Sequence, residues 1–118
     1  MPYTCGFVDV TERNEHFDWH IRRRAEFPCS SPDEYERMAD EFLGALLSHP
    51  LDSGMWECYR RKSDGTRGDY IRYNDLTGEF GVLSENNVIR TYFIPDPLDH
   101  GMPNNLEYFR LQCGKIQR

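Results

Sequence analysis

The sequence has few of the features that would assign it to a well-defined class at once. Its 118 residues contain four cysteines and no C-x-x-C pair, which suits neither a disulfide-rich scaffold nor a zinc knuckle. We expect Cys5, Cys29, Cys58 and Cys113 to be reduced thiols, mostly buried, although the count alone leaves room for one bridge. No apolar run has the length that a membrane span needs. The N-terminus has no basic segment followed by an apolar one, so we expect no signal peptide and no membrane partner.

Positive charge is also scarce. The chain carries 14 Lys and Arg against 20 Asp and Glu, a formal net charge of -6. This balance argues against a protein that coats nucleic acid by bulk electrostatics. Basic residues are clustered, however, at Arg22–Arg24 and at Arg60–Lys62. A small basic site on an acidic body is therefore compatible with the composition.

The organisation of the chain indicates one domain, residues 1–118, because we find no repeat, linker or low-complexity segment. We expect a helical part at about 11–49, a sheet at about 55–94 and a C-terminal segment at 95–118. Helices that precede a run of strands predict an α+β fold with the helices on one face of the sheet.

The clearest helix signal covers residues 32–48. Ser31 is the expected N-cap, Pro32 the first helical residue, and Glu34 completes a capping box. Apolar residues recur at helical spacing as one stripe: Tyr35, Met38, Ala39, Phe42, Leu46 and Leu47. Acidic residues should cover the other faces: Asp33, Glu34, Glu36, Asp40 and Glu41.

A shorter helix is expected at residues 11–24, with Thr11 as N-cap. Its candidates for the inward face are Phe17, Trp19, His20 and Ile21.

Four later runs have the character of strands, and turn residues separate them: "MWECYRRK", "DYIRYN", "EFGVLS" and "VIRTYFI". Short connections predict a four-stranded antiparallel meander. The tail "NNLEYFRLQ" predicts a short helix that packs Leu106, Phe109 and Leu111 on the sheet.

The pair His16-x-x-x-His20 raises the question of a metal site. Two histidines four apart share one helix face and can begin a zinc site. No third ligand stands at a recognisable spacing, so we expect no metal and no other cofactor. For His16 we favour a packed position at the edge of the core. In the same way, a run of charged residues such as Arg22–Arg24 usually lies on a solvent-exposed face.

The strands carry groups that suit phosphate chemistry: Tyr70 and Arg72 on one, Arg90, Thr91 and Tyr92 on another. RNA cleavage without a metal needs a base for the 2′-proton, an acid for the leaving 5′-oxygen, and donors for the charge on phosphorus. His20, Arg72 and Thr91 could together meet these needs. Strand alternation places Thr91 on the same face as Ile89 and Phe93, which look like core residues.

The segments "HFDWH…EF", "SPDEYERMADEFL", "GDYIRYNDLTGEFGVLSENNVIRTYFIPDP" and "HGMPNNLEYF" resemble the C-terminal toxin domains of bacterial polymorphic and contact-dependent growth inhibition toxins. The similar subgroup has the barnase/EndoU/colicin/RelE-like (BECR) ribonuclease fold. This resemblance implies a monomeric, metal-independent endoribonuclease that often cuts tRNA and that a cognate immunity protein neutralises. It also implies delivery as part of a larger toxin and action in the target-cell cytoplasm.

The resemblance assigns roles to three residues. His20 is implied as general acid or base, Arg72 as ligand of the scissile phosphate, and Thr91 as a hydrogen-bond donor to it. Phe93 stands where some relatives carry a tyrosine, so that role is either absent or moved to another tyrosine: Tyr92, Tyr70 or Tyr108.

A second departure from the family lies after His20, where relatives usually have glycine and this chain has "IRRR". We expect Arg22, Arg23 and Arg24 to help hold RNA, with Arg90 and His100 as further substrate-binding candidates. His100 is also a second proton-transfer candidate, or simply a turn residue beside Gly101.

Two other functions stay open. One is a non-catalytic RNA- or protein-binding module of similar fold, from a phage or mobile element. The other is a small protein with only a protein partner, which the acidic helix face would contact.

Overall fold

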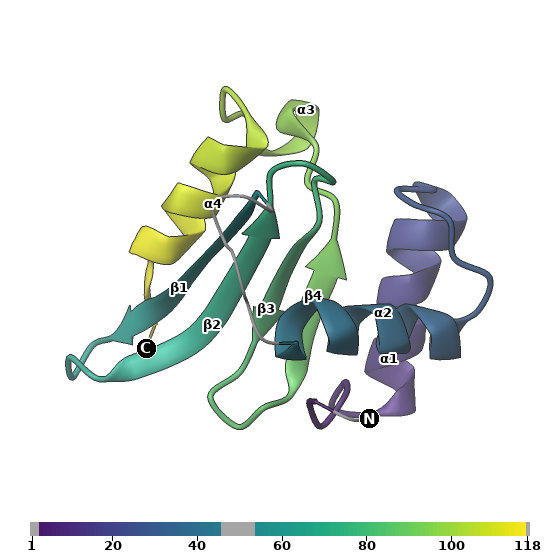
Figure 1. The fold of residues 1–118 in the computed structure, drawn as a ribbon, viewed down its shortest axis with the longest axis horizontal. Coiled ribbons are helices and arrows are strands. Elements are labelled where there is room, and N and C mark those ends of the chain that lie inside the picture. Colours follow the sequence, from purple (N-terminus) through teal and green to yellow (C-terminus); the bar gives the residue numbers. More distant parts are fainter. Residues whose placement is uncertain (1–2, 46–53, 118) are drawn as a thin grey trace.

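The sheet is the centre of the fold. The computed structural model describes residues 3–45 and 54–117. Its strands are β1 (Met55–Lys62), β2 (Arg67–Asn74), β3 (Phe80–Leu83), β4 (Ile89–Phe93) and β5 (Ile116–Gln117). Their order is β4-β3-β2-β1-β5 (Figure 1). The first four form the predicted antiparallel meander.

The prediction of four strands was wrong by one, because β5 pairs in parallel with β1 and makes the sheet mixed. A strand of two residues is too short to show an alternating pattern, so the sequence had no signal for it. The α+β class is confirmed.

Helices cover both faces of the sheet, not one (Figure 1). On one face, α1 (Val10–Phe17), the π-helix η1 (Asp18–Arg23) and α2 (Pro32–Gly44) enclose a cluster that includes Tyr35, Tyr70 and Tyr92. On the other, α4 (Asn105–Gly114) encloses a second cluster that includes Ile71 and Phe109. Since successive strand residues point to opposite faces, β2 supplies both clusters. A short helix, α3 (Pro97–His100), connects β4 to α4.

Helix α1 begins earlier than expected, with Asp9 as N-cap in place of Thr11. Phe17 and Ile21 are buried as predicted, while Trp19 is 49% exposed. The reason is that the backbone passes into the π-helix η1 from Asp18 onward, which changes the residue spacing of the faces.

Helix α2 has the predicted start, because Ser31 accepts a hydrogen bond from the Glu34 amide. It ends at Gly44, four residues before the expected end; Leu46 and Leu47 lie outside the described residues. Asp40 was expected on the exposed side, but it is fully buried and accepts hydrogen bonds from the amide (2.8 Å) and hydroxyl (2.5 Å) of Thr4. This carboxylate attaches the N-terminal segment to α2.

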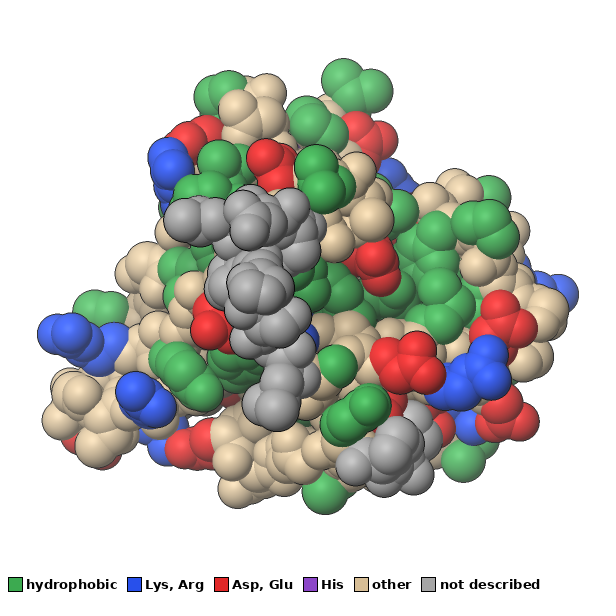
Figure 2. Space-filling model, viewed as in Figure 1, with side chains coloured by type: hydrophobic (Ala, Val, Ile, Leu, Met, Phe, Trp, Pro, Cys, Tyr) green, Lys and Arg blue, Asp and Glu red, His purple; other side chains and the backbone are tan. Residues whose placement is uncertain are grey.

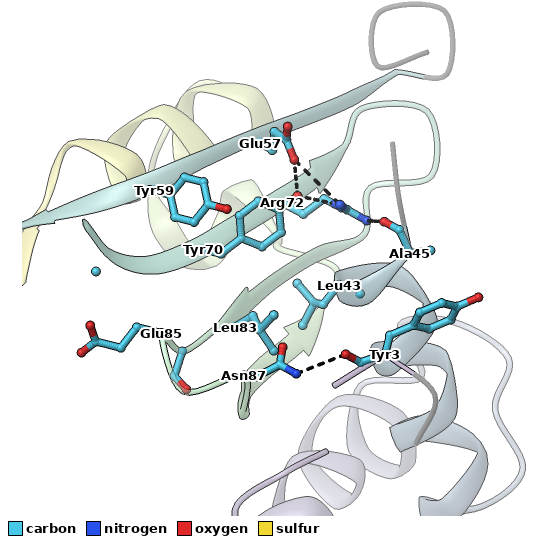
Figure 3. Close-up of a pocket in the computed structure, with 13 residues that line it drawn as sticks. Tyr3, Leu43, Ala45, Glu57, Tyr59, Tyr70, Arg72, Leu83, Glu85 and Asn87 are labelled. Carbon is cyan, nitrogen blue, oxygen red and sulfur yellow. Dashed lines mark hydrogen bonds and ion pairs between the residues drawn. The ribbon is translucent and has the colours of Figure 1, made fainter. Parts of the chain in front are cut away.

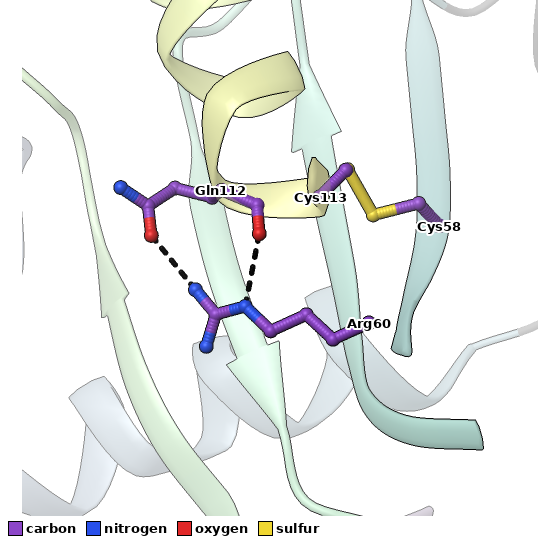
Figure 4. The surroundings of a disulfide bond; sticks show 4 residues. All are labelled: Cys58, Arg60, Gln112 and Cys113. Atoms are coloured by element: carbon purple, nitrogen blue, oxygen red, sulfur yellow. Dashed lines mark hydrogen bonds between the residues drawn. A yellow bond between two sulfur atoms is a disulfide. The ribbon is translucent and has the colours of Figure 1, made fainter. Parts of the chain in front are cut away.

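Cys58 and Cys113 form a disulfide that joins β1 to α4 (Figure 4), so the expectation of four reduced thiols was wrong. Beside it, Arg60 donates to the backbone carbonyl (2.9 Å) and side-chain carbonyl (2.7 Å) of Gln112. The tail helix was predicted correctly, and Phe109 is buried; Leu111, however, is 46% exposed. No helix within residues 3–45 and 54–117 has the length and apolar content needed to cross a membrane.

Candidate active site

A cavity of about 160 Å³ brings together residues from η1, the end of β4, α3 and α4. We call it the His20 pocket. Its aromatic and histidine lining consists of Trp19, His20, Phe93, His100 and Tyr108. Its charged lining consists of Arg24, Glu26, Asp96 and Asp99. Segments from both ends of the chain therefore meet at one site.

His20 is held in this pocket by two contacts. Its Nδ1 lies 2.8 Å from Glu26 Oε2, and its ring stacks on Phe93 with the centroids 4.8 Å apart. His20 and Glu26 are both well buried, since their side chains are 11% and 8% exposed. A carboxylate on Nδ1 places the proton there and leaves Nε2 as the basic nitrogen, which is how a histidine is oriented as a general base.

Glu26 is itself fixed at both oxygens. Its Oε1 accepts a hydrogen bond of 2.6 Å from the Ile94 amide, just after β4. The other oxygen faces His20 and lies 3.4 Å from Arg24 Nε. The carboxylate thus connects the end of η1 to the end of β4 and determines the position of the imidazole between them.

Two uncommon backbone conformations bring Glu26 back onto His20. His20 lies within the π-helix η1, and Ala25 has a φ of +48°. The turn is closed by hydrogen bonds from the Ala25 amide to the Ile21 carbonyl and from the Glu26 amide to the His20 carbonyl. A left-handed conformation in a non-glycine residue is unfavourable and concentrates at functional sites, as do π-helical turns.

His100 and Tyr108 also line the pocket, and the centroids of their stacked rings are 4.4 Å apart. Both nitrogens of His100 have partners: Nδ1 accepts from the Met102 amide at 3.1 Å, and Nε2 lies 2.9 Å from Asn105 Oδ1. In this arrangement Nε2 is the nitrogen that donates, to Asn105, and Nδ1 is the one that accepts. Burial raises the pKa of Tyr108. Among the three tyrosines considered for the missing role, Tyr108 is the one that lines this pocket.

The charge of the pocket is mostly negative. Arg24 is the one arginine among the described lining residues, and it pairs with Asp99, with Asp96 at 3.6 Å and with Glu26 at 3.4 Å. A bound phosphate would compete with these carboxylates for Arg24. The neighbouring Arg22 pairs with Asp18 at 3.4 Å, and Arg23 lies over the Trp19 ring at 5.7 Å.

Arg72 lies elsewhere, beside a cavity of about 490 Å³ between β1, β2 and the end of α2 (Figure 3). Arg72 is 5% exposed. The guanidinium donates to the carbonyls of Phe42 and Ala45, each at 2.7 Å, and to the hydroxyl of Tyr70 at 2.7 Å. A cation that satisfies the last carbonyls of a helix stabilises its C-terminus. Arg72 therefore caps α2.

Tyr70 and Tyr92 both keep their protons. Tyr70 donates to Glu57 and Tyr92 to Glu79. In each case burial is the main cause that raises the pKa of the phenol, and the hydrogen bond to a carboxylate adds to it. Tyr92 is fully buried in the core.

Thr91 and Arg72 lie on opposite faces of the sheet. Arg72 of β2 pairs across the strands with Gly81 of β3, and Gly81 pairs with Tyr92 of β4. Residues paired in this way point to the same face of the sheet. Thr91 is the next residue along β4 and pairs with Val82 of the second cluster. An irregularity between Val82 and Leu83 leaves Ile89 on the face of Tyr92, which separates Ile89 from Thr91. The structure does not bring His20, Arg72 and Thr91 together.

The remaining candidates have structural partners. Arg90 pairs with Asp69 at 2.9 Å, far along β4 from the pocket end. His16 contacts Phe7 and lies 3.2 Å from Glu12, at the edge of the first cluster, and burial is the main cause that lowers its pKa. Within the described residues, no group of three or more His, Cys, Asp or Glu side chains is arranged to hold a metal ion.

The site residue that sequence reasoning missed is Glu26. The signal available was its place in "AEF", which belongs to the quoted resemblance. The arrangement places the His20 imidazole beside an oriented carboxylate, with the Tyr108 phenol in the lining of the same pocket. This suits proton transfer from a hydroxyl. No family model matches this chain, and no curated protein matches its sequence significantly.

Proposed function

We propose that this chain is a metal-independent endoribonuclease domain with His20 as its general base. The observation that carries the proposal is the His20–Glu26 pair at 2.8 Å, which leaves Nε2 for a substrate proton. In the reaction, the RNA 2′-hydroxyl gives its proton to His20 and its oxygen attacks the adjacent phosphorus. The 5′-oxygen leaves and takes a proton, so that the products are a 2′,3′-cyclic phosphate and a 5′-hydroxyl.

Tyr108 is the proposed acid for the leaving oxygen. It lines the pocket with His20, and a phenol whose pKa is raised by burial keeps its proton until a strong base forms. His100 fits this role less well, because an acidic Nδ1 would lose the bond from the Met102 amide. We assign His100 the positioning of Tyr108, on which its ring stacks.

The wider role rests on the sequence resemblance. We propose a toxin domain whose substrate is tRNA, which acts as a monomer in the target-cell cytoplasm after delivery within a larger protein. A cognate immunity protein would neutralise it. Thr91 and Arg72 are not part of the catalytic group in this proposal.

A second function has specific support. The His20 pocket has three carboxylates against one guanidinium, and Arg72 is committed to the end of α2. Both facts favour a non-catalytic binding module, for which a local excess of negative charge is no obstacle.

The test is incubation of purified protein with total bacterial RNA in EDTA, followed by mapping of the new ends. The matched variants are His20→Gln and Glu26→Gln, each checked by circular dichroism for a native fold. Discrete fragments with cyclic phosphate ends, absent with His20→Gln, would support the ribonuclease. Intact RNA at high protein concentration would refute it in favour of the binding module.

A further inference from the structure

The basic run Arg60–Lys62 has no role in the proposed chemistry, and its three members differ in their surroundings. Arg60 is held by Gln112, and Lys62 pairs with Glu85 at 2.5 Å. Arg61 is exposed, and within the described residues it has no ion-pair partner. The middle residue of the run therefore presents its charge to solvent.

Arg61 lies directly opposite Arg67 in the β1–β2 pairing. Like charges at such cross-strand positions destabilise a hairpin. Arg67 is also exposed, and its guanidinium lies 4.5 Å from the centre of the Tyr59 ring. No carboxylate of the described residues forms an ion pair with Arg67 either. The nearest turn acid, Asp64, instead accepts bonds from the Thr66 amide (2.9 Å) and hydroxyl (2.6 Å).

These side chains surround a depression of about 230 Å³. Its lining consists of Tyr59, Arg60, Arg61, Gly65, Thr66 and Arg67. Among the described residues, this lining has three guanidiniums and no carboxylate, the reverse of the His20 pocket. Figure 2 shows blue side chains at the left end of the molecule, among other places, and Figure 1 places the β1–β2 turn at this end. Arg60 lies 3.7 Å from Asp69, but Arg61 and Arg67 have no carboxylate partner among the described residues. Two such guanidiniums favour an anion, and phosphate is one of the anions whose geometry fits the guanidinium fork.

We propose that the β1–β2 hairpin binds single-stranded RNA, with Arg61 and Arg67 on consecutive backbone phosphates. This inference rests on the proposed function, because it names where that substrate is held outside the His20 pocket. Tyr59 holds the Arg67 guanidinium in place and is itself 49% exposed. It also lines the larger cavity, where Tyr70 lies 5.2 Å away. A strand with its phosphates on the two arginines can thus place a base beside the exposed Tyr59 ring, which is how single strands are commonly held.

The shape of the surface explains why this site should prefer single-stranded RNA to a duplex. Helix α2 covers the parts of this face formed by β2, β3 and β4, whereas Tyr59 of β1 is exposed. Unpaired bases can turn toward an exposed aromatic ring, and bases within a duplex cannot.

The experiment measures binding of a fluorescent 12-nucleotide 2′-O-methyl RNA by anisotropy, over a series of salt concentrations. A 2′-O-methyl strand lacks the attacking hydroxyl, so binding is measured without cleavage. The test variant is Arg61→Gln/Arg67→Gln, in which both changes are on exposed residues. The control is Arg37→Gln/Arg110→Gln, which removes the same charge from exposed positions on α2 and α4.

We expect the test variant to bind at least tenfold more weakly at moderate salt. Its slope of log affinity against log salt should fall by about 1.4, because each phosphate contact on a single strand contributes about 0.7. The control should keep the slope of the wild type. An unchanged slope in the test variant, an equal loss in the control, or no binding by the wild type would overturn the inference.

The same proteins separate this inference from the proposed function. If the wild type cleaves total RNA but binding does not depend on Arg61 and Arg67, the ribonuclease proposal stands and the β1–β2 site is refuted. If binding depends on these two arginines but the wild type cleaves no RNA, the β1–β2 site stands and the ribonuclease proposal is refuted.

Discussion

Reduction of the Cys58–Cys113 disulfide is predicted to cost a large share of the stability of this domain. The bond closes a loop with a sequence separation of 55. For a loop of that length, the chain-entropy relation gives about 4 kcal/mol in the free energy of unfolding. Since unfolding entropy is about 2.1 cal/mol/K per residue, a chain of 118 residues should lose about 15 °C in Tm.

Helix α4 should nevertheless stay docked after reduction. Arg60 still bonds to Gln112, and Phe109 is still buried against the sheet. We therefore expect a native circular dichroism spectrum with lower stability, and not a partly unfolded chain. This distinction matters if the domain acts in a reducing compartment, because the thiol form is then the working form.

The assay is thermal and urea unfolding of three proteins with and without dithiothreitol. These are the wild type, Cys58→Ser/Cys113→Ser, and the control Cys5→Ser/Cys29→Ser, which removes the two free thiols. Reductant should lower the Tm of the wild type and of the control, and leave the first variant unchanged. Two results would refute the reasoning. One is four titratable thiols in the unreduced, urea-unfolded wild type, and the other is a wild-type Tm that does not change when reductant is added.

Three further predictions concern single residues, each measured by urea unfolding. Ala25→Gly should raise the free energy of unfolding by about 0.5 kcal/mol, because glycine adopts a φ of +48° without the steric cost that alanine has there. This gain exceeds the loss that comes from the greater conformational entropy of glycine in the unfolded chain. A loss of stability in this variant would contradict the strain at Ala25. Arg72→Met should lower the free energy of unfolding by about 3 kcal/mol, because buried carbonyls at the end of α2 lose their donor; an exposed control, Arg61→Gln, should change it by less than about 0.5 kcal/mol. Burial lowers the pKa of His16 in the folded state, so the unfolded state binds more protons and stability should fall as the pH drops below about 6.5; His16→Gln should make the difference between pH 8 and pH 5.5 smaller.

Much of the fold could be predicted because its signals are local. The cap at Ser31 and the turns of the meander are contained in a few consecutive residues each, and both were found. The disulfide could not be predicted, because its partners are 55 residues apart and nothing in their spacing relates them. Arg72 illustrates a subtler limit. The strand that carries it was predicted, but a strand pattern does not say that the end of α2 lies over the face from which Arg72 projects.

The candidate site was predicted in part, because His20, Arg24, His100 and Tyr108 were named from the sequence and all four line the His20 pocket. His20 was chosen from chemistry and resemblance, whereas Glu26 was missed because contact between them depends on a π-helix followed by a left-handed alanine. Neither conformation has a reliable sequence signal. Thr91 was chosen from chemistry and resemblance alone. The register places Arg72, Gly81 and Tyr92 on one face of the sheet, so Thr91, one residue from Tyr92 along β4, lies on the other face.

The contact between His20 and Glu26 has a structural explanation that competes with the catalytic one. Glu26 joins η1 to the end of β4 through the Ile94 amide, and such a link would be useful in a protein without any activity. An amide at position 26 could accept the same bond from Ile94, so a purely structural link should tolerate Glu26→Gln. A base at His20 would not tolerate it equally, because a carboxylate stabilises the imidazolium that forms when the proton arrives, and an amide does not. The two explanations therefore differ in a variant that keeps the shape and removes only the charge. The strained Ala25 favours the catalytic one, since a link alone could have been made from relaxed backbone.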